Sequence, residues 1–246
     1  SRIIFLMIGD FAAVSIICLP TASLPVKAII RTSGCDTRAV PGSAPPCTML
    51  ITPGGNPASS KISPIKPDVI GVIGEVLETT VLPAASAGAT FDMEKISARC
   101  DASPEENGCN DEGRAIFSSG VRDERIVGMI PMAGSIDSQF FGSDGHLTVD
   151  IPILAMSGTD DPVGAEEQYT RCAGMDITWL ELIGGCHQTF GFGGCTTLDD
   201  ELGFSLIGAY ALAFARRTIF LDETTEVVGY LDGSISPSDK VVFHDE

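Results

Sequence analysis

The chain has 246 residues, which allows one large domain or two small ones. Hydrophobic residues make up 44% of it and charged residues 20%, a balance that is typical of globular proteins and excludes a disordered chain. Its 15 Lys and Arg against 33 Asp and Glu give a net charge of −18, so the chain repels phosphate backbones and anionic membrane surfaces, and nucleic acid is not expected as a partner.

The first third of the chain predicts few regular elements. Ile3–Ile8 is a continuous apolar run, as expected of a strand buried on both faces of a sheet. Residues 20–65 are rich in Pro, Gly and Ser, which predicts mostly loop with one short strand at Thr48–Thr52. A helix that begins with a proline is expected at Pro67–Glu78, and a short apolar strand at Thr80–Ala84.

A regular alternation of strands and helices follows a polar excursion at residues 99–114. The expected elements are strands at Arg125–Met132, Ile151–Ser157 and Ile177–Ile183, and helices at Ala165–Cys172 and Leu198–Arg217. This alternation indicates an α/β fold with a parallel sheet. Neither a repeat nor a linker is visible, so we expect a single domain over residues 1–246, with a polar C-terminal extension from about residue 222.

Eight cysteines favour an oxidising compartment, so a secreted or periplasmic location is expected. No metal site is expected, because neither CxxC nor Cys/His ligand spacing is present. The longest apolar stretch, Phe11–Leu19, is about half of the ~20 residues that a membrane span needs, so no span is expected. Asp10 interrupts the apolar run after Arg2, which favours a mature or truncated chain over a retained signal peptide.

Polar side chains follow three predicted strands, at the carboxyl ends where open parallel sheets place their sites. They are, in chain order, Ser86 after Ala84, Asp160 and Asp161 after Ser157, and His187 after Ile183. The order serine, aspartate, histidine is that of an α/β-hydrolase triad.

Ser86 lies in the short motif Ala-Ala-Ser-Ala-Gly, which matches the pattern GxSxG with alanine at the first glycine. Small flanking residues let a strand and a helix approach closely around a sharp turn. The alternative is a small-residue turn that only packs the start of a helix. With an acid and a histidine also present, Ser86 is interpreted as a nucleophile, and Ser86→Ala is expected to abolish ester hydrolysis with the fold intact.

His187 is the best candidate for a general base among three histidines, because it follows a strand and opens a glycine-rich loop. The alternative is a structural histidine whose ring nitrogens are both satisfied. Asp160 and Asp161 compete for the role of the acid, which must accept the second imidazole N–H. Asp-Asp-Pro is also good turn chemistry, and Asp137 is a third candidate.

Three stretches carry a resemblance to a known family: RIVGMIPMAG at 125–134, IPILAMSGTDDP at 151–162 and GCHQTF at 185–190. Here, and at the Ser86 turn, the chain resembles the dienelactone-hydrolase-like branch of the α/β-hydrolases, over roughly residues 65–220. That branch includes secreted bacterial esterases and cutinase-like polyester hydrolases. In the family pattern G-x-x-D-P the acid precedes the proline, which here is Asp161.

The resemblance implies an α/β-hydrolase fold with Ser86 as nucleophile, His187 as base and Asp161 as acid. The oxyanion hole would use the backbone N–H of Ala87 and one from the loop after the first strand, at Asp10 or Phe11. The implied activity is cleavage of small or polymeric carboxylic esters through an acyl-enzyme, with no metal or organic cofactor.

Two alternatives to an esterase stay open, and the sequence leaves the oligomeric state open as well. One is a non-catalytic binding module on the same fold, which is favoured by Ile-Gly-Asp-Phe at residues 8–11, where the family often has a His-Gly pair. The other is a thioesterase, lactonase or peptidase, which shares the triad and the fold.

Local spacing predicts disulfides. The expected pairs are Cys186 with Cys195, Cys100 with Cys109 and Cys35 with Cys47. The first pair brackets the His187 loop and would close a ten-residue ring that holds the base. If the Cys186 side chain points into the sheet instead, Cys172 on the preceding helix becomes its partner.

Overall fold

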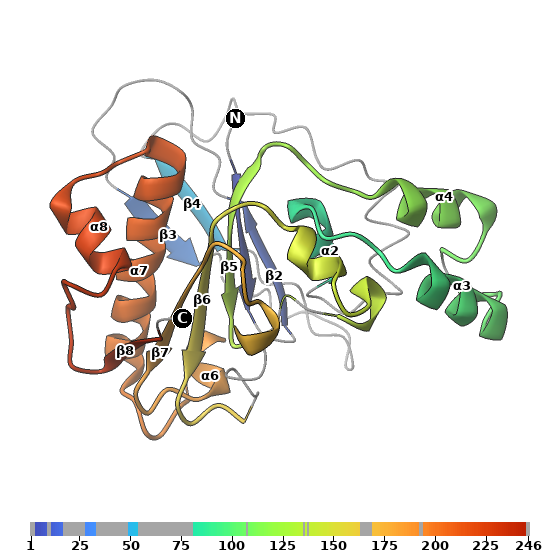
Figure 1. Cartoon of the computed structure of the whole chain (residues 1–246). Helices are drawn as coiled ribbons and strands as arrows, with labels where there is room; N and C mark the ends of the chain where they lie inside the picture. Colours follow the sequence, from blue (N-terminus) through green and yellow to red (C-terminus); the bar gives the residue numbers. More distant parts are fainter. Residues whose placement is uncertain are drawn as a thin grey trace.

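The computed structural model describes a central sheet flanked by helices (Figure 1). The described residues are 3–8, 11–16, 28–32, 49–53, 81–106, 108–134, 136, 138–162, 169–191 and 194–244. Within them the sheet has six strands in the order β2-β1-β5-β6-β7-β8, and β3 and β4 form a separate antiparallel pair.

The strands are β1 Ile3–Ile8, β2 Phe11–Ile16, β3 Ala28–Thr32, β4 Met49–Pro53, β5 Ile126–Met132, β6 Ile153–Gly158, β7 Ile177–Leu182 and β8 Val241–His244. The helices are α2 Val81–Ala87, α3 Met93–Ala102, α4 Asp111–Ser119, α6 His187–Phe190, α7 Asp200–Phe220 and α8 Thr225–Leu231. Two short 3-10 turns, η1 Gln139–Phe141 and η2 Gly145–Thr148, lie between β5 and β6.

Four neighbouring strands of the sheet run parallel. β1 pairs with β5, β5 with β6 and β6 with β7 in parallel register, whereas β2 and β8 add antiparallel edges. The expected α/β architecture with a mostly parallel sheet is confirmed. The carboxyl ends of β1, β5, β6 and β7 therefore lie along one edge of the sheet, and their amino ends along the other.

The core has two parts, one built around α7 and one around α2. Leu206, Tyr210 and Phe214, spaced by four along α7, are buried in one cluster with strand residues such as Ile130 and Leu180. α7 begins where the carboxylate of its N-cap residue accepts the Leu202 N–H, which fixes the helix start. These side chains, four residues apart, therefore form the buried face of this helix.

The second part of the core packs around α2. Three phenylalanines share it, with the ring of Phe91 5.0 Å from that of Phe117 and 5.5 Å from that of Phe141. The polar excursion at residues 99–114 contains the end of α3 and the start of α4, and these two helices extend away from the sheet in Figure 1. The side chains of Asp92 and Asn110 cap these two helices, which explains where each begins.

One predicted element has the wrong type. The strand expected at Thr80–Ala84 is absent, because Val81–Ala87 form the helix α2. A short apolar run does not distinguish a strand from a buried helix, and the three alanines here have the highest helix propensity of any residue. Pro83 lies in the first turn, where no backbone N–H is needed. The helix expected at Pro67–Glu78 lies outside the described residues.

The polar C-terminal extension is ordered, with α8 against α7 and β8 on the edge of the sheet. Within the described residues no single helix has the length and apolar composition of a membrane span. α7 and α8, bent by 120° to each other, meet those criteria only as a pair.

Candidate active site

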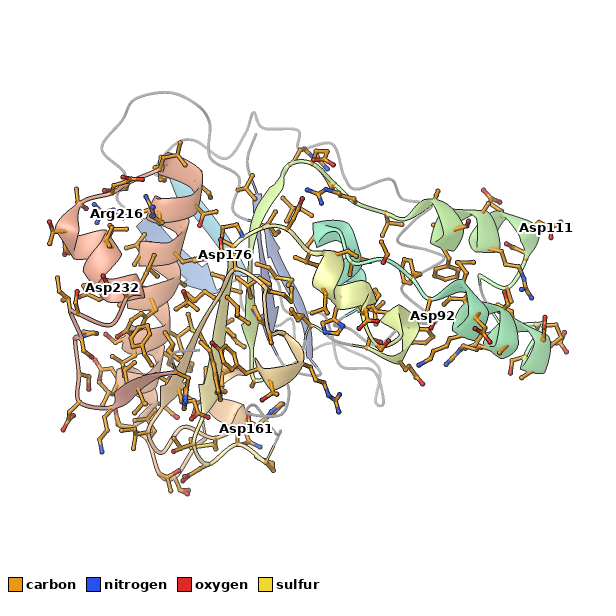
Figure 2. All side chains as sticks on the ribbon, in the orientation of Figure 1. Asp92, Asp111, Asp161, Asp176, Arg216 and Asp232 are labelled. Carbon is orange, nitrogen blue, oxygen red and sulfur yellow. A yellow bond between two sulfur atoms is a disulfide. The ribbon has the colours of Figure 1, made fainter. Side chains whose placement is uncertain are left out.

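Asp161 and His187 meet at the carboxyl edge of the sheet, just after β6 and β7 (Figure 2 labels Asp161 beside α6). The Nδ1 atom of His187 lies 3.2 Å from Oδ2 of Asp161. The Asp161 side chain is 1% exposed and that of His187 is 19% exposed. An ionised carboxylate only accepts hydrogen bonds, so the contact places the imidazole proton on Nδ1. Nε2 is then a lone-pair acceptor, the state that a general base requires.

The turn that carries Asp161, the predicted acid, is fixed by backbone contacts. The Asp161 N–H donates to the Gly158 carbonyl oxygen at 3.0 Å, and the Asp160 N–H donates to the Gly185 carbonyl oxygen at 2.8 Å. A Cβ atom on Gly158 would lie 2.1 Å from that same Gly185 oxygen, so only glycine allows the two turns to approach so closely. The acid turn is thus bonded directly to the turn that precedes the base.

The turn that carries His187, the predicted base, is closed by a disulfide. Cys186 is the N-cap of α6, and its N–H donates to the buried Thr189 hydroxyl at 3.1 Å. Cys186 is bonded to Cys195, with their Cα atoms 5.8 Å apart. The first predicted disulfide is therefore confirmed, and the alternative pairing of Cys186 with Cys172 is wrong.

A second predicted disulfide is also confirmed, between Cys100 and Cys109, with their Cα atoms 5.0 Å apart. It lies in the α3–α4 region, away from the acid and the base. The predicted pair Cys35 and Cys47 lies outside the described residues.

Asp161, which precedes Pro162, is the aspartate that contacts His187. Asp160 is exposed, and its carboxylate accepts a weak hydrogen bond of 3.4 Å from Thr159. Asp137 lies outside the described residues. The geometry therefore favours Asp161 over its neighbour as the residue that orients the imidazole.

The other two histidines have structural partners. The buried His146 places Nε2 3.0 Å from the Arg171 carbonyl oxygen. His244 lies 2.8 Å from a Glu181 carboxylate oxygen, and its ring stacks on Trp179 at 3.8 Å. His244 therefore joins β8 to β7, away from the acid turn.

Ser86 does not meet His187. Its side chain is 1% exposed inside α2, and its Oγ has no hydrogen-bond partner among the described residues. Its carbonyl oxygen accepts the Asp123 N–H at 2.9 Å, just before β5 begins. Arg125 donates to the Asp123 carboxylate, which fixes this turn and lowers the pKa of Asp123.

These contacts place Ser86 at the amino edge of the sheet, whereas His187 lies at the carboxyl edge. β5 has seven residues, so the two edges are roughly 20 Å apart at about 3.3 Å per residue. The sharp strand-to-helix turn expected at Ser86 is also wrong, because Val81–Ala87 form the helix α2 in place of the expected strand and turn. Ala87, the expected oxyanion donor, lies at the end of the same helix and hence at the same amino edge.

Phe11, the other expected oxyanion donor, is placed differently. It begins β2 and pairs with Ile8 at the end of β1. Because β1 runs parallel to β5, Phe11 lies at the carboxyl edge of the sheet, the edge that holds the acid and the base. Asp10 lies outside the described residues.

We expect Ser86→Ala to leave ester hydrolysis within about twofold of wild type and to raise stability. The substitution removes a buried hydroxyl that has no hydrogen-bond partner among the described residues, and it introduces a better helix former. The free energy of unfolding should therefore rise by about 0.5–1.5 kcal/mol. Urea unfolding and kcat on the same preparations check both parts. A loss of more than about a hundredfold in kcat would restore Ser86 as the nucleophile.

Sequence reasoning missed Thr159 and Gly184, which join the acid turn to the base turn through a hydrogen bond. The only signal for them was a glycine directly after each of the two predicted strands, Gly158 and Gly184. No group of three or more His, Cys, Asp or Glu side chains in the described part of the chain is placed to hold a metal ion.

The sequence matches no protein-family model, and no curated protein is significantly similar to it. The resemblance to dienelactone-hydrolase-like enzymes therefore stays a prediction from the short stretches that carry it.

Proposed function

We propose that the chain is a carboxylic-ester hydrolase of the α/β-hydrolase fold, with His187 as general base and Asp161 as the acid that orients it. The observation that carries this proposal is the contact between His187 Nδ1 and a carboxylate that is almost fully buried. A buried acid bonded to a partly exposed imidazole is the arrangement that acyl-transfer enzymes use to activate a hydroxyl. The position of both groups at the carboxyl edge of a parallel sheet supports it further.

In the proposed reaction, Nε2 of His187 takes the proton of an attacking hydroxyl as the oxygen bonds to the ester carbonyl carbon. The resulting imidazolium is stabilised by Asp161, which stays ionised. The same proton then goes to the departing alkoxide as the carbon–oxygen bond breaks, which releases an alcohol and leaves an acyl-enzyme. Water repeats the sequence and releases the carboxylic acid. The Phe11 N–H is the proposed oxyanion donor at this edge.

The nucleophile in this proposal is a serine other than Ser86, because Ser86 lies at the opposite edge of the sheet. A fluorophosphonate probe reacts only with an activated hydroxyl, so it identifies the residue without prior assignment. We expect wild-type protein to be labelled at one serine, found by peptide mass spectrometry, and His187→Ala to be labelled at a rate lower by at least about a hundredfold.

The same probe separates the competing functions. Ser86→Ala is the matched control and should label like the wild type. Absence of labelling in the wild-type protein would favour the non-catalytic binding module. With labelling established, a panel of p-nitrophenyl esters, thioesters, lactones and peptides distinguishes an esterase from a thioesterase, lactonase or peptidase, since fold and acid–base pair alone do not set the substrate.

A secreted or periplasmic location is part of this proposal. Two disulfides fit an oxidising, extracytoplasmic environment, because reducing compartments keep such thiols reduced. The ester substrate is accordingly expected outside the cytoplasm.

A further inference from the structure

One hydroxyl group connects the turn that carries the acid to the turn that carries the base. Thr159 lies between β6 and Asp161, and its Oγ1 accepts the N–H of Gly184 at 2.8 Å. The backbone N–H of Thr159 donates to the Leu182 carbonyl oxygen at 3.1 Å. Thr159 therefore holds the chain that leaves β7 at two points, three and five residues before His187.

Gly184 is held from its other side as well. Its carbonyl oxygen accepts the Thr197 hydroxyl at 2.6 Å, from the segment that leads into α7. Its φ of +78° is in the left-handed region, and a Cβ atom there would lie 2.7 Å from the Thr197 carbonyl oxygen. The Gly184 backbone is thus fixed between the acid turn and the segment that follows the base, and its conformation suits glycine alone.

We propose that Thr159 is a positioning residue, which sets the place of the His187 imidazole relative to Asp161 through its bond to the Gly184 N–H. Without this bond, the turn that leads into His187 loses one of its links to the turn that carries Asp161. A small displacement there lengthens a contact that is already 3.2 Å. The proposal rests on the proposed function only where kcat is the readout, because the Nδ1 contact is observable without a substrate.

The test compares Thr159→Val, which keeps the shape of the side chain and removes the hydroxyl, with Thr159→Ser, which keeps the hydroxyl. In Thr159→Val we expect kcat for ester hydrolysis to fall about five- to tenfold, with KM within about twofold, as for the loss of one hydrogen bond that orients the base. Thr159→Ser should restore kcat to within about twofold of wild type.

Thr148→Val is the matched control. The Thr148 hydroxyl also joins two turns, with a bond of 2.8 Å to the Gly88 carbonyl oxygen, but it lies before β6, at the amino edge of the sheet. We expect its loss to affect stability and to leave kcat unchanged. An equal fall of kcat in both valine variants would overturn the positioning role.

The second readout is the downfield proton resonance of the His187 Nδ1–H in its hydrogen bond to Asp161, assigned by its loss in His187→Gln. We expect the resonance in the wild type, Thr159→Ser and Thr148→Val, and its loss in Thr159→Val. Its retention in Thr159→Val, or its absence from the wild type, would overturn the proposal. Ester hydrolysis that is unaffected in His187→Gln would overturn the proposed function instead, and the resonance would still decide the role of Thr159.

Discussion

Asp161→Asn should lower kcat for ester hydrolysis on the order of 10³- to 10⁴-fold, with a much smaller effect on KM. An amide in place of the carboxylate loses the charge that stabilises the imidazolium. Its NH2 group also favours the His187 tautomer with the proton on Nε2, the atom that must accept a proton. The measurement is steady-state kinetics on the best ester of the panel, at a temperature where urea unfolding shows the variant to be folded.

Asp160→Asn is the matched control, because it makes the same chemical change one residue earlier in the same turn. Asp160 is exposed and makes no contact with His187 among the described residues, so kcat should stay within about twofold of wild type. A larger loss in Asp160→Asn than in Asp161→Asn would reverse the assignment. Equal activity of both variants and the wild type would remove the acid–base pair from the mechanism.

The proximity of Asp161 and His187 was predictable because they follow neighbouring strands, Asp161 three residues after the end of β6 and His187 five residues after the end of β7. In a parallel sheet all carboxyl ends lie at one edge, so the order of elements alone brings residues 26 positions apart into contact. The choice between two neighbouring aspartates came from the resemblance to G-x-x-D-P. The structure adds what a pattern does not contain, namely that the Asp161 carboxylate is buried and the Asp160 carboxylate is exposed.

Ser86 illustrates the limit of pattern reading. A motif of small residues around a serine suits a sharp turn after a strand, and it suits the end of an alanine-rich helix equally well. The deciding contact is long-range: the bond from Asp123 to the Ser86 carbonyl oxygen anchors α2 at the amino edge of the sheet. No local pattern specifies which edge a segment packs against.

The edge strand β8, Val241–His244, was also not predicted from the sequence. In this strand His244 stacks on Trp179, and its Nε2 atom lies 2.8 Å from a carboxylate oxygen of Glu181. The Glu181 carboxylate also accepts the Ser157 hydroxyl, which itself accepts the Trp179 indole N–H. This polar network depends on three strands being adjacent, so no single segment indicates it.

Removal of the Cys186–Cys195 disulfide should lower both the stability of the protein and its activity. The bridge closes a ten-residue ring, and its loss frees the unfolded chain, which should lower the free energy of unfolding by about 2–3 kcal/mol. Cys186 also caps α6, whose first residue is His187, so the double variant Cys186→Ser/Cys195→Ser should lower kcat about tenfold or more even where it is fully folded.

The double variant Cys100→Ser/Cys109→Ser is a matched control within the same chain. Its bridge has the same sequence separation of nine, so the loss of unfolded-state entropy and the fall in stability should be similar. Because that bridge joins α3 to the start of α4, kcat should stay near the wild-type value. Urea unfolding and kcat, measured on both variants well below their unfolding transitions, separate the two effects. Equal kcat in the two variants would show that the disulfide beside His187 stabilises the fold without holding the base in place.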